Sequence, residues 1–240
     1  MIHTARPKFS LFAFGWFCLC AFVALGGERG NPKLPIDSLP EKIDIDQVPD
    51  SISLQRSIPS DNALTVEKVS LGRKLFFDPI LSGDRTVSCA SCHQPEHGFA
   101  SPDKKAVGID GQIGERNAPT VLNRAYGKHF FWDGRASSLE EQALKPIENA
   151  KELGSSVNEV IDRLRNDQAY VDRFRKAFSD SASDSIDAVV SAQNLAKSLA
   201  AFQRTLLIGD SPVDRFQGGE FSALTVMQKK GLWIFESRGG

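Results

Sequence analysis

The sequence predicts an all-α protein in which long loops connect the helices. From Val66 onward apolar residues recur at helical spacing, and Leu75 and Phe76 continue this first pattern. No run of alternating apolar and polar residues indicates a strand. Capping patterns at Ser138 and Ser156 support the same fold class.

Two capping boxes mark the starts of helices in the middle of the chain. Ser138 with Glu141 three residues later predicts a helix that ends before Pro146. Ser156 with Glu159 predicts a second helix, whose apolar residues form one stripe. That stripe consists of Val157, Val160, Ile161 and Leu164.

Two more helices are expected toward the C-terminus. A longer one follows the Ser156 helix, and a last one begins near Ser222. Ordinary packing explains these apolar stripes. The core-facing residues of the longer helix are Ile186, Val189, Val190, Leu195, Leu199 and Phe202.

The loop lengths indicate where a functional site can lie, and the composition limits the kinds of partner. Residues 78–88, 100–120 and 126–136 form loops that are long for a small helical domain, and long loops often carry a site. The 240 residues, 41% of them hydrophobic, suffice for one core or two small ones. A formal net charge of −1 favours neither a nucleic-acid partner nor binding to an acidic membrane.

The N-terminus predicts export. Arg6 and Lys8 precede an uncharged, largely apolar run from Phe9 to Leu25, and Ala24 and Gly26 supply a small-x-small exit. This pattern is typical of a secretory signal, here residues 1–26. Retention as an N-terminal anchor is the alternative, because the run is close to the length that spans a bilayer. In both cases the rest of the chain is exported.

Residues 27–62 are expected to form an extended leader that lies on a neighbour or in solvent. The stretch is polar and is interrupted repeatedly by proline, which disfavours helices. The prolines are Pro32, Pro35, Pro40, Pro49 and Pro59.

The stretch SCASCHQPEHGF contains two of the four cysteines. Cys18 and Cys20 lie inside the apolar N-terminal run and are interpreted as hydrophobic residues there. The exported part then holds only Cys89 and Cys92, which are separated by two residues and followed at once by His93. In an exported protein such a pair fits a disulfide, a thioredoxin-like redox pair, part of a zinc site, or covalent haem.

Covalent haem explains the whole motif best. A closed zinc site needs four ligands and would be cramped here. A thioredoxin-type pair needs a strand-to-helix junction, which the sequence does not indicate. In the haem interpretation, thiols one helical turn apart join the two vinyl groups, and the imidazole of His93 is the proximal iron ligand. Whether the sixth iron position is open then separates an enzyme from an electron carrier.

The chain resembles the bacterial diheme cytochrome c peroxidases and the related diheme enzyme that matures the tryptophan-derived cofactor of methylamine dehydrogenase. The resemblance runs from about Leu71 to Gly240, and it implies two cytochrome c-like domains in the periplasm. A peroxidatic haem would lie in the first domain, at 63–215, and a haem that receives electrons in the second, which would begin at 216–240. The matching stretches are LGRKLFFDPILS, CASCH, GERNAPTVLN, FFWDGRASSLEEQALKPI and RTLLIGDSPVDRF.

The resemblance also assigns roles to individual residues. His93 matches the proximal ligand, and Gln142 and Glu152 match the distal glutamine and glutamate of the peroxidatic pocket. Trp132 matches the tryptophan between the two haems. Asn117 matches a side-chain ligand of an interface calcium, whose other protein ligands are implied to come from backbone carbonyls beyond residue 240.

Each of these residues also has an ordinary structural interpretation. Glu152 would then be a solvated loop residue, and Gln142 would face water on its helix. Trp132 would pack in a core or at a domain interface. Asn117 would cap a helix beginning near Pro119.

One position departs from the family pattern. Ile109 stands where many members supply a distal histidine to the resting peroxidatic haem, and isoleucine cannot ligate iron. His97 is tethered too closely to His93 to reach the opposite haem face, and His129 is a weak alternative ligand. The expected haem is five-coordinate or water-bound.

The C-terminal stretch LTVMQKKGLWIFESRGG resembles the helix that leads into the family's second haem motif. The sequence stops at Gly240 before another cysteine, so a fragment or a truncated product is expected. Apolar residues there would lack a complete partner domain and would be exposed. They are Leu224, Val226, Leu232, Trp233, Ile234 and Phe235.

These observations predict a periplasmic haem c peroxidase-type oxidoreductase. Glu152 would move a proton of hydrogen peroxide with help from Gln142. Electrons would come from a small cytochrome c or a cupredoxin through a second haem and Trp132. Oxidation of a protein substrate, and a monohaem electron carrier or remnant domain, are the alternatives. The resemblance further implies a homodimer as one form of the protein.

Overall fold

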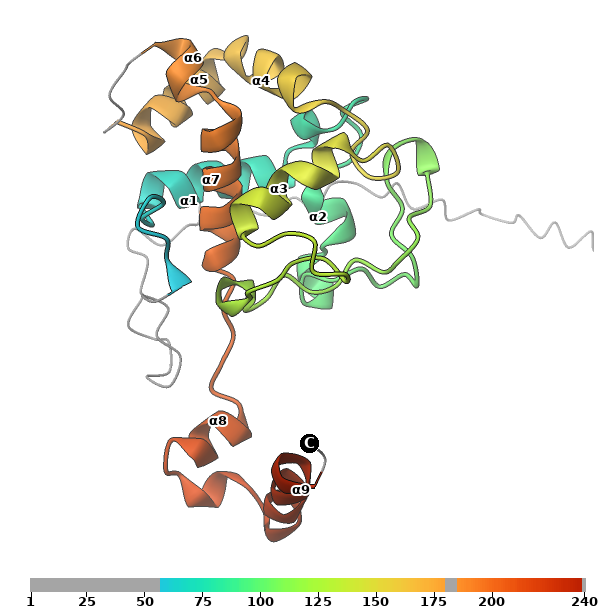
Figure 1. Ribbon diagram of the computed structural model, residues 1–240, viewed down its shortest axis with the longest axis vertical. Coiled ribbons are helices and arrows are strands. Elements are labelled where there is room, and N and C mark those ends of the chain that lie inside the picture. The colour runs from blue at the N-terminus through green and yellow to red at the C-terminus, as the bar shows by residue number, and fades with distance from the viewer. Residues whose placement is uncertain (1–56, 180–184, 239–240) are drawn as a thin grey trace, which may run out of the picture.

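The computed structural model describes residues 57–179 and 185–238 (Figure 1). Within these residues the chain forms helices and isolated bridges but no strand, which confirms the all-α class. No helix in the described ranges combines the length and apolar content needed to cross a bilayer. The α-helices are α1 (Val66–Phe77), α2 (Cys89–Cys92), α3 (Leu139–Glu148), α4 (Val157–Arg165), α5 (Gln168–Ala177), α6 (Ile186–Val189), α7 (Ala192–Arg204), α8 (Pro212–Gln217) and α9 (Val226–Ser237).

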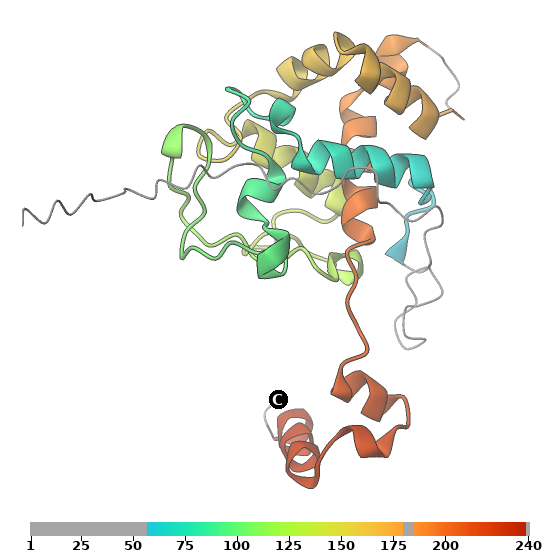
Figure 2. The ribbon, with the colours of Figure 1, turned by 180° about the vertical axis from the view of Figure 1, so that it is seen from behind.

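Helices α1 and α7 cross at the centre of the fold, and both ribbon views show them in contact (Figures 1 and 2). Gly72 permits this approach, because a Cβ atom there would lie 1.9 Å from the carbonyl oxygen of Ser198. The central crossing therefore depends on the absence of a side chain at Gly72.

Thr65 caps α1 by accepting a hydrogen bond from the Lys68 amide at 3.2 Å.

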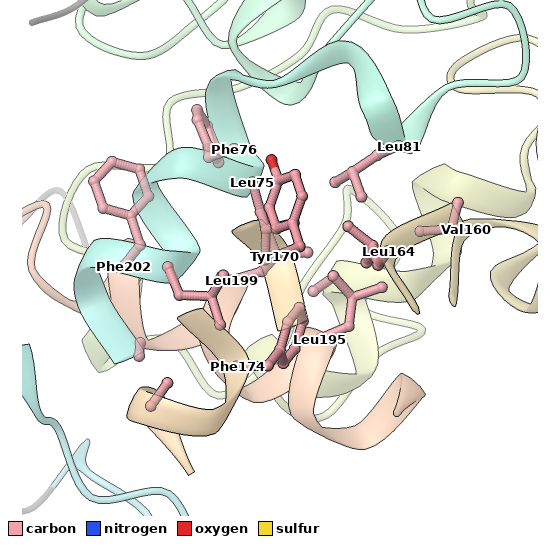
Figure 3. Close-up of a cluster of buried hydrophobic side chains, with 14 of the residues drawn as sticks. Leu75, Phe76, Leu81, Val160, Leu164, Tyr170, Phe174, Leu195, Leu199 and Phe202 are labelled. Atoms are coloured by element: carbon pink, nitrogen blue, oxygen red, sulfur yellow. The ribbon is translucent and has the colours of Figure 1, made fainter. Parts of the chain in front are cut away.

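The hydrophobic core lies where α1, α4, α5 and α7 meet (Figure 3). The Tyr170 ring is buried there, and its hydroxyl donates to the Asp78 carboxylate at 2.6 Å. Asp78 also accepts from Lys74 at 3.1 Å, so the polar end of the buried ring is satisfied. Other core side chains include Leu75, Phe76, Leu81, Val160, Leu164, Phe174, Leu195, Leu199 and Phe202.

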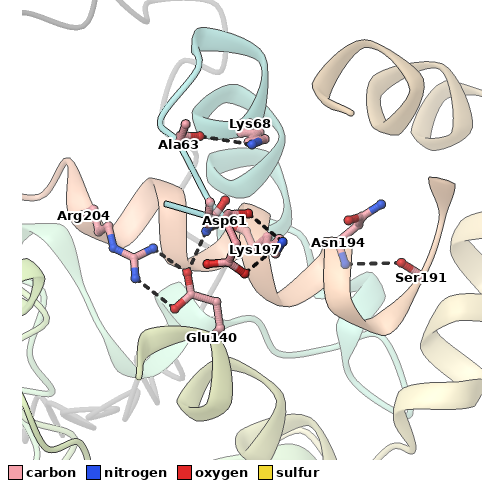
Figure 4. A network of polar contacts seen from close by, with 9 residues as sticks. Asp61, Ala63, Lys68, Glu140, Ser191, Asn194, Lys197 and Arg204 are labelled. Atoms are coloured by element: carbon pink, nitrogen blue, oxygen red, sulfur yellow. Dashed lines mark hydrogen bonds and ion pairs between the residues drawn. The ribbon is translucent and has the colours of Figure 1, made fainter. Parts of the chain in front are cut away.

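A buried ion pair joins α3 to α7 (Figure 4). Arg204 Nη1 and Nη2 donate to the two carboxylate oxygens of Glu140 at 2.6 and 2.9 Å. Asn62 donates to the same carboxylate at 2.7 Å and to the Lys197 carbonyl at 3.1 Å. The end of the expected leader is therefore packed into the helical domain, whereas residues 1–26 and 27–56 lie outside the described residues.

Both capping signals start helices as predicted, but the end predicted for the first helix is wrong. Ser138 accepts from the Glu141 amide, but the Glu141 carboxylate accepts from Ser137, so the predicted capping box is incomplete there. Ser156 with Glu159 forms a complete capping box. Helix α3 continues past Pro146 to Glu148. Burial of Ile147 offsets the hydrogen bond that proline cannot donate, since this side chain is fully enclosed in the core.

The long helix predicted over 186–202 is divided into α6 and α7. Ser191 begins α7 by accepting from the Asn194 amide, and the Asn194 side chain donates to the carbonyls of Ala188 and Val189. These hydrogen bonds satisfy the end of α6 and the start of α7, which stabilises the break. Ile186 is exposed, while the remaining predicted core residues of this region are buried.

The C-terminal helices α8 and α9 are set apart from the helical core in both ribbon views (Figures 1 and 2). Helix α9 begins after Thr225 rather than near Ser222, which lies in a short 3-10 turn. Leu224 is buried and Leu232 half-buried. The predicted apolar exposure is confirmed for Val226, Trp233, Ile234 and Phe235, which are each more than half exposed.

Candidate functional site

The residues of the CASCH stretch lie on and just after α2. Ser88 precedes this helix, and its backbone amide donates to Ser91 Oγ at 3.0 Å. The His93 amide donates to the Cys89 carbonyl at 2.9 Å, so histidine ends the same turn that carries both thiols. One helical turn thus presents all three groups needed for haem attachment.

The ring orientation of His93 is fixed by two backbone carbonyls. Nδ1 lies 3.2 Å from the Phe99 oxygen and 3.0 Å from the Pro119 oxygen. A carbonyl can only accept, so Nδ1 carries the proton and Nε2 keeps a lone pair. Burial lowers the His93 pKa, although these two carbonyls act in the opposite direction. A neutral imidazole with an available Nε2 is the form that binds iron.

The two thiols fit thioether attachment. Cys89 and Cys92 are half-buried, and within the described chain no disulfide joins them. Burial raises the Cys89 pKa to about 12, with smaller contributions from Cys92 and Glu152. Cys92 Sγ donates to the Val107 carbonyl at 3.5 Å. The donor set therefore suits haem c, held by Cys89 and Cys92 and ligated by His93.

Glu152 lies in the tight turn that follows α3. Its side chain is half-buried, and Oε1 accepts from Asn149 Nδ2 at 2.7 Å. Burial raises the Glu152 pKa, while the Asn149 hydrogen bond and the charge of Arg135 partly offset that effect. The loop 107–109 links this turn to the attachment motif, because Val107 accepts from the Cys92 thiol and the Ile109 amide donates to the Glu152 carbonyl. A carboxyl group with a raised pKa is better suited to exchange a proton than an ordinary glutamate.

A second loop packs against the Glu152 turn. The Ile109 amide donates to the Glu152 carbonyl at 2.8 Å, and the Ile109 side chain is buried against Gly154. A Cβ atom on Gly108 would lie only 2.3 Å from the Lys151 oxygen, so a glycine is required there. The structure therefore places Ile109 next to the turn that carries Glu152. His97 and His129 are both exposed.

Gln142 lies in α3, half-buried, and no side-chain hydrogen bond occupies its amide within the described ranges. Gln142 is on α3 and Glu152 is in the turn that follows, but no hydrogen bond joins the two side chains in that part of the structure. The structure places both residues on one continuous segment without showing them in contact.

Trp132 and Asn117 are brought together on the surface. Trp132 Nε1 donates to the Asn117 carbonyl at 3.0 Å, and the indole is 63% exposed. Within the described residues Trp132 does not pack in the core, and its packing at a domain interface stays a prediction. No helix begins near Pro119, so Asn117 has no helix to cap there. Its Nδ2 instead donates to the carbonyls of Ser101 and Asp103.

The segment 117–123 connects several parts of the site. Pro119 supplies a carbonyl to His93, and Asn117 supplies one to Trp132. At the other end, Asn123 exchanges two hydrogen bonds with the backbone of Ile208 at 3.0 and 2.9 Å. The Asn123 amide also donates to the Leu206 carbonyl at 2.8 Å. This segment therefore joins the histidine to the chain leading into α8.

The sequence did not predict the groups that act on His93 and Glu152. Asn149 and Arg135 act on Glu152, and the carbonyls of Phe99 and Pro119 act on His93. Asn149 caps the observed end of α3, but the end predicted before Pro146 left this residue in a loop. The backbone carbonyls leave no side-chain signal, so only the loop structure reveals them.

The all-α fold, the CASCH turn and the carbonyl-held histidine together define a cytochrome c-like haem domain. A family model for the di-haem cytochrome c peroxidases matches residues 66–222, and family membership implies haem c. The chain belongs to the di-haem cytochrome c peroxidase family. This confirms the resemblance found in the sequence.

Named relatives agree with this assignment. The methylamine utilization protein MauG of Methylorubrum extorquens is 42% identical, over 76% of this chain and 50% of that protein. The cytochrome c551 peroxidase of Pseudomonas aeruginosa is 39% identical over 80% and 53%. A crystal structure of a MauG-like protein associated with microbial copper homeostasis has a TM-score of 0.65 and 32% identity, covering 74% of this chain and 51% of that one. The chain spans about half the length of these relatives.

Proposed function

We propose that this protein is a haem c peroxidase-type enzyme that reduces hydrogen peroxide. The supporting observation is Glu152, a half-buried carboxyl group with a raised pKa, whose turn is joined to the haem attachment motif through the 107–109 loop. When bound, haem c supplies the redox-active iron. The reaction consumes one peroxide, two electrons and two protons and yields two molecules of water.

In this proposal side chains of the protein transfer the proton and orient the peroxide. Splitting the O–O bond heterolytically requires a proton to move from one peroxide oxygen to the other. Glu152 takes the proton from the first oxygen and returns it to the leaving one. Gln142 orients peroxide by hydrogen bonding, and His93 holds its Nδ1 proton toward the carbonyls of Phe99 and Pro119.

Oxidation of a protein substrate is the second candidate function. Ile109 favours it, because an aliphatic side chain stands next to the Glu152 turn where a histidine ligand would close the site. An open iron position does not by itself select peroxide chemistry over longer-range oxidation. Peroxide turnover with a small redox protein, compared with oxidation of a candidate protein substrate, separates the two functions.

The Glu152→Gln variant is expected to slow peroxide decay by the ferric holoprotein at least tenfold. Glutamine keeps the size of the side chain but cannot accept the proton at neutral pH. Stopped-flow absorbance at the main haem band measures this rate. Glu148→Gln, an exposed change at the end of α3 just before the Glu152 turn, is the matched control and should keep the native rate. Native peroxide decay in Glu152→Gln would contradict the enzyme proposal and favour an electron carrier.

We also propose a cellular location, a domain organisation and an electron donor for the protein. Residues 1–26 direct export to the periplasm, residues 63–215 form the peroxidatic domain, and 216–240 begin a second haem domain in a longer protein. A small cytochrome c or cupredoxin supplies electrons through that second haem and Trp132. The exposed indole supports the route, since a surface ring can contact a partner domain. The family resemblance leads us to propose a homodimer as well.

We further propose that Asn117 contributes one ligand to a calcium ion. Its Nδ2 is held by two carbonyls, while Oδ1 has no hydrogen bond within the described residues. That oxygen cannot suffice, because calcium takes six to eight oxygen ligands. No group of three or more His, Cys, Asp or Glu side chains in the described ranges could hold a metal. The family resemblance implies that the other protein ligands are backbone carbonyls beyond residue 240.

In the full-length holoprotein, Asn117→Ala is expected to weaken calcium binding at least tenfold in a calorimetric titration. Removal of an oriented amide oxygen deletes one ligand and loosens the loop that Asn117 holds. Asn158→Ala, on the exposed face of α4, should leave the affinity unchanged. Equal affinity in the Asn117 and Asn158 variants would remove Asn117 from the site.

A further inference from the structure

Asn149 uses nearly all of its polar groups within the Glu152 turn. Its Oδ1 accepts from the Lys151 amide at 3.0 Å, and its backbone carbonyl accepts from the amides of Glu152 and Gly154 at 2.9 Å each. Its Nδ2 donates to Glu152 Oε1 at 2.7 Å. Asn149 therefore builds the turn and also binds the carboxylate that the turn presents.

The two oxygens of Glu152 have different surroundings. Oε1 is engaged by the Asn149 amide, whereas Oε2 accepts no hydrogen bond within the described residues. An amide N–H can only donate, so it favours an unprotonated Oε1. A proton that binds this carboxyl group is therefore directed to Oε2.

We propose that Asn149 is a positioning residue that holds Glu152 Oε1 and makes Oε2 the oxygen that accepts and returns the proton. The inference rests on the proposed proton transfer by Glu152. Asn149 acts only through the carboxylate, and its effect has two parts. It fixes the direction of Oε2, and it stabilises the ionised form that accepts the first proton.

Other charged or ionisable groups near the carboxylate come from three elements. Arg135, in the loop before α3, favours the ionised form. The Cys89 thiol on α2 is near enough for its pKa to respond to the carboxylate. Lys151 is adjacent in sequence, but its ammonium pairs with Glu115 at 3.2 Å. None of these groups replaces the hydrogen bond that Asn149 donates to Oε1.

The test compares Asn149→Ala and Asn149→Asp with the native holoprotein across pH. Aspartate keeps the acceptor for the Lys151 amide and replaces only the donor, so it preserves the turn if alanine prevents folding. Loss of the donor destabilises ionised Glu152 and raises its pKa. The acidic limb of the peroxide-decay profile should move up by about one pH unit in Asn149→Ala and further in Asn149→Asp. Rates below that limb should then fall about tenfold.

A spectroscopic measurement separates this role from a structural one. Infrared difference spectra of the ferric holoprotein, with Glu152→Gln as the blank, report the pH at which the protonated carboxyl band appears. That pH should rise together with the kinetic limb. Asn166→Ala is the matched control, because Asn166 also ends a helix but its side chain donates to the Asp162 carbonyl and to no carboxylate within the described residues.

The outcomes are distinguishable. If Glu152→Gln decays peroxide at the native rate, the proposed function fails and the inference fails with it. Suppose that the Glu152→Gln variant decays peroxide slowly, but the Asn149 variants keep the native pH of the acidic limb and of the carboxyl band. Only the positioning role of Asn149 is then overturned. A uniform loss of rate without a pH shift, equal to that of Asn166→Ala, would also overturn it.

Discussion

Secretion of the Cys89→Ser, Cys92→Ser double variant is expected to yield a chain with no covalently bound haem. Each thioether requires a sulfur, and His93 alone offers only a coordinate bond that denaturation breaks. The loss should be essentially complete in a haem stain of a denaturing gel and in the intact mass. Because α2 is short and ends at His93, the same change is also expected to loosen the loop that follows it.

The control for haem attachment lies at the other cysteines. Cys18→Ser and Cys20→Ser should leave the haem content of the secreted chain unchanged, because neither residue belongs to the CASCH motif. Covalent haem retained by the Cys89, Cys92 double variant would contradict attachment through these thiols. A zinc or disulfide function would then have to be tested by metal analysis and thiol titration.

Glu140→Ala is expected to lower the free energy of unfolding by about 3–5 kcal/mol, because it leaves the Arg204 guanidinium buried without its counterion. The Arg204 side chain is only 4% exposed, and its Nε already has no hydrogen-bond partner among the described residues. Chemical denaturation followed by circular dichroism measures the change. Glu148→Ala, an exposed change on the same helix, should alter stability by less than about 0.5 kcal/mol.

The Glu140 contribution also depends on pH. Burial alone would raise the Glu140 pKa, but hydrogen bonds from Arg204 and Asn62 outweigh it and lower the pKa below 4.5. The stabilisation is therefore complete above pH 4.5 and is lost as the pH falls through the lower folded value. Glu140→Leu combined with Arg204→Met should recover much of the stability, since it removes both charges. A double variant no more stable than Glu140→Ala would contradict this account.

Local sequence signals predicted the helices well and the interruptions poorly. Ser138 and Ser156 mark helix starts because a cap is a contact between near neighbours. Pro146 misled the prediction, since burial of Ile147 against distant helices keeps the chain helical. The break before Ser191 depends on the Asn194 side chain folding back onto α6, a choice that apolar periodicity does not encode.

The sequence also predicted one part of the candidate site and not the other. The attachment motif was predictable because Cys89, Cys92 and His93 act within one helical turn. The surroundings of Glu152 were not, since they depend on how Ile109 and the 100–120 loop return to the end of α3. Roles for Gln142, Glu152, Trp132 and Asn117 came from family resemblance and stay predictions until variants are measured.

The segment 117–123 also ties the C-terminal helices to the candidate haem ligand. Its ends are tied by the side chains of Asn117 and Asn123, and the ring of Pro119 restricts rotation between them. Ile208, which precedes α8, is bonded to Asn123 at one end of this stretch. Because the Pro119 carbonyl holds His93, the imidazole and the chain that enters α8 are attached to the same short piece of backbone.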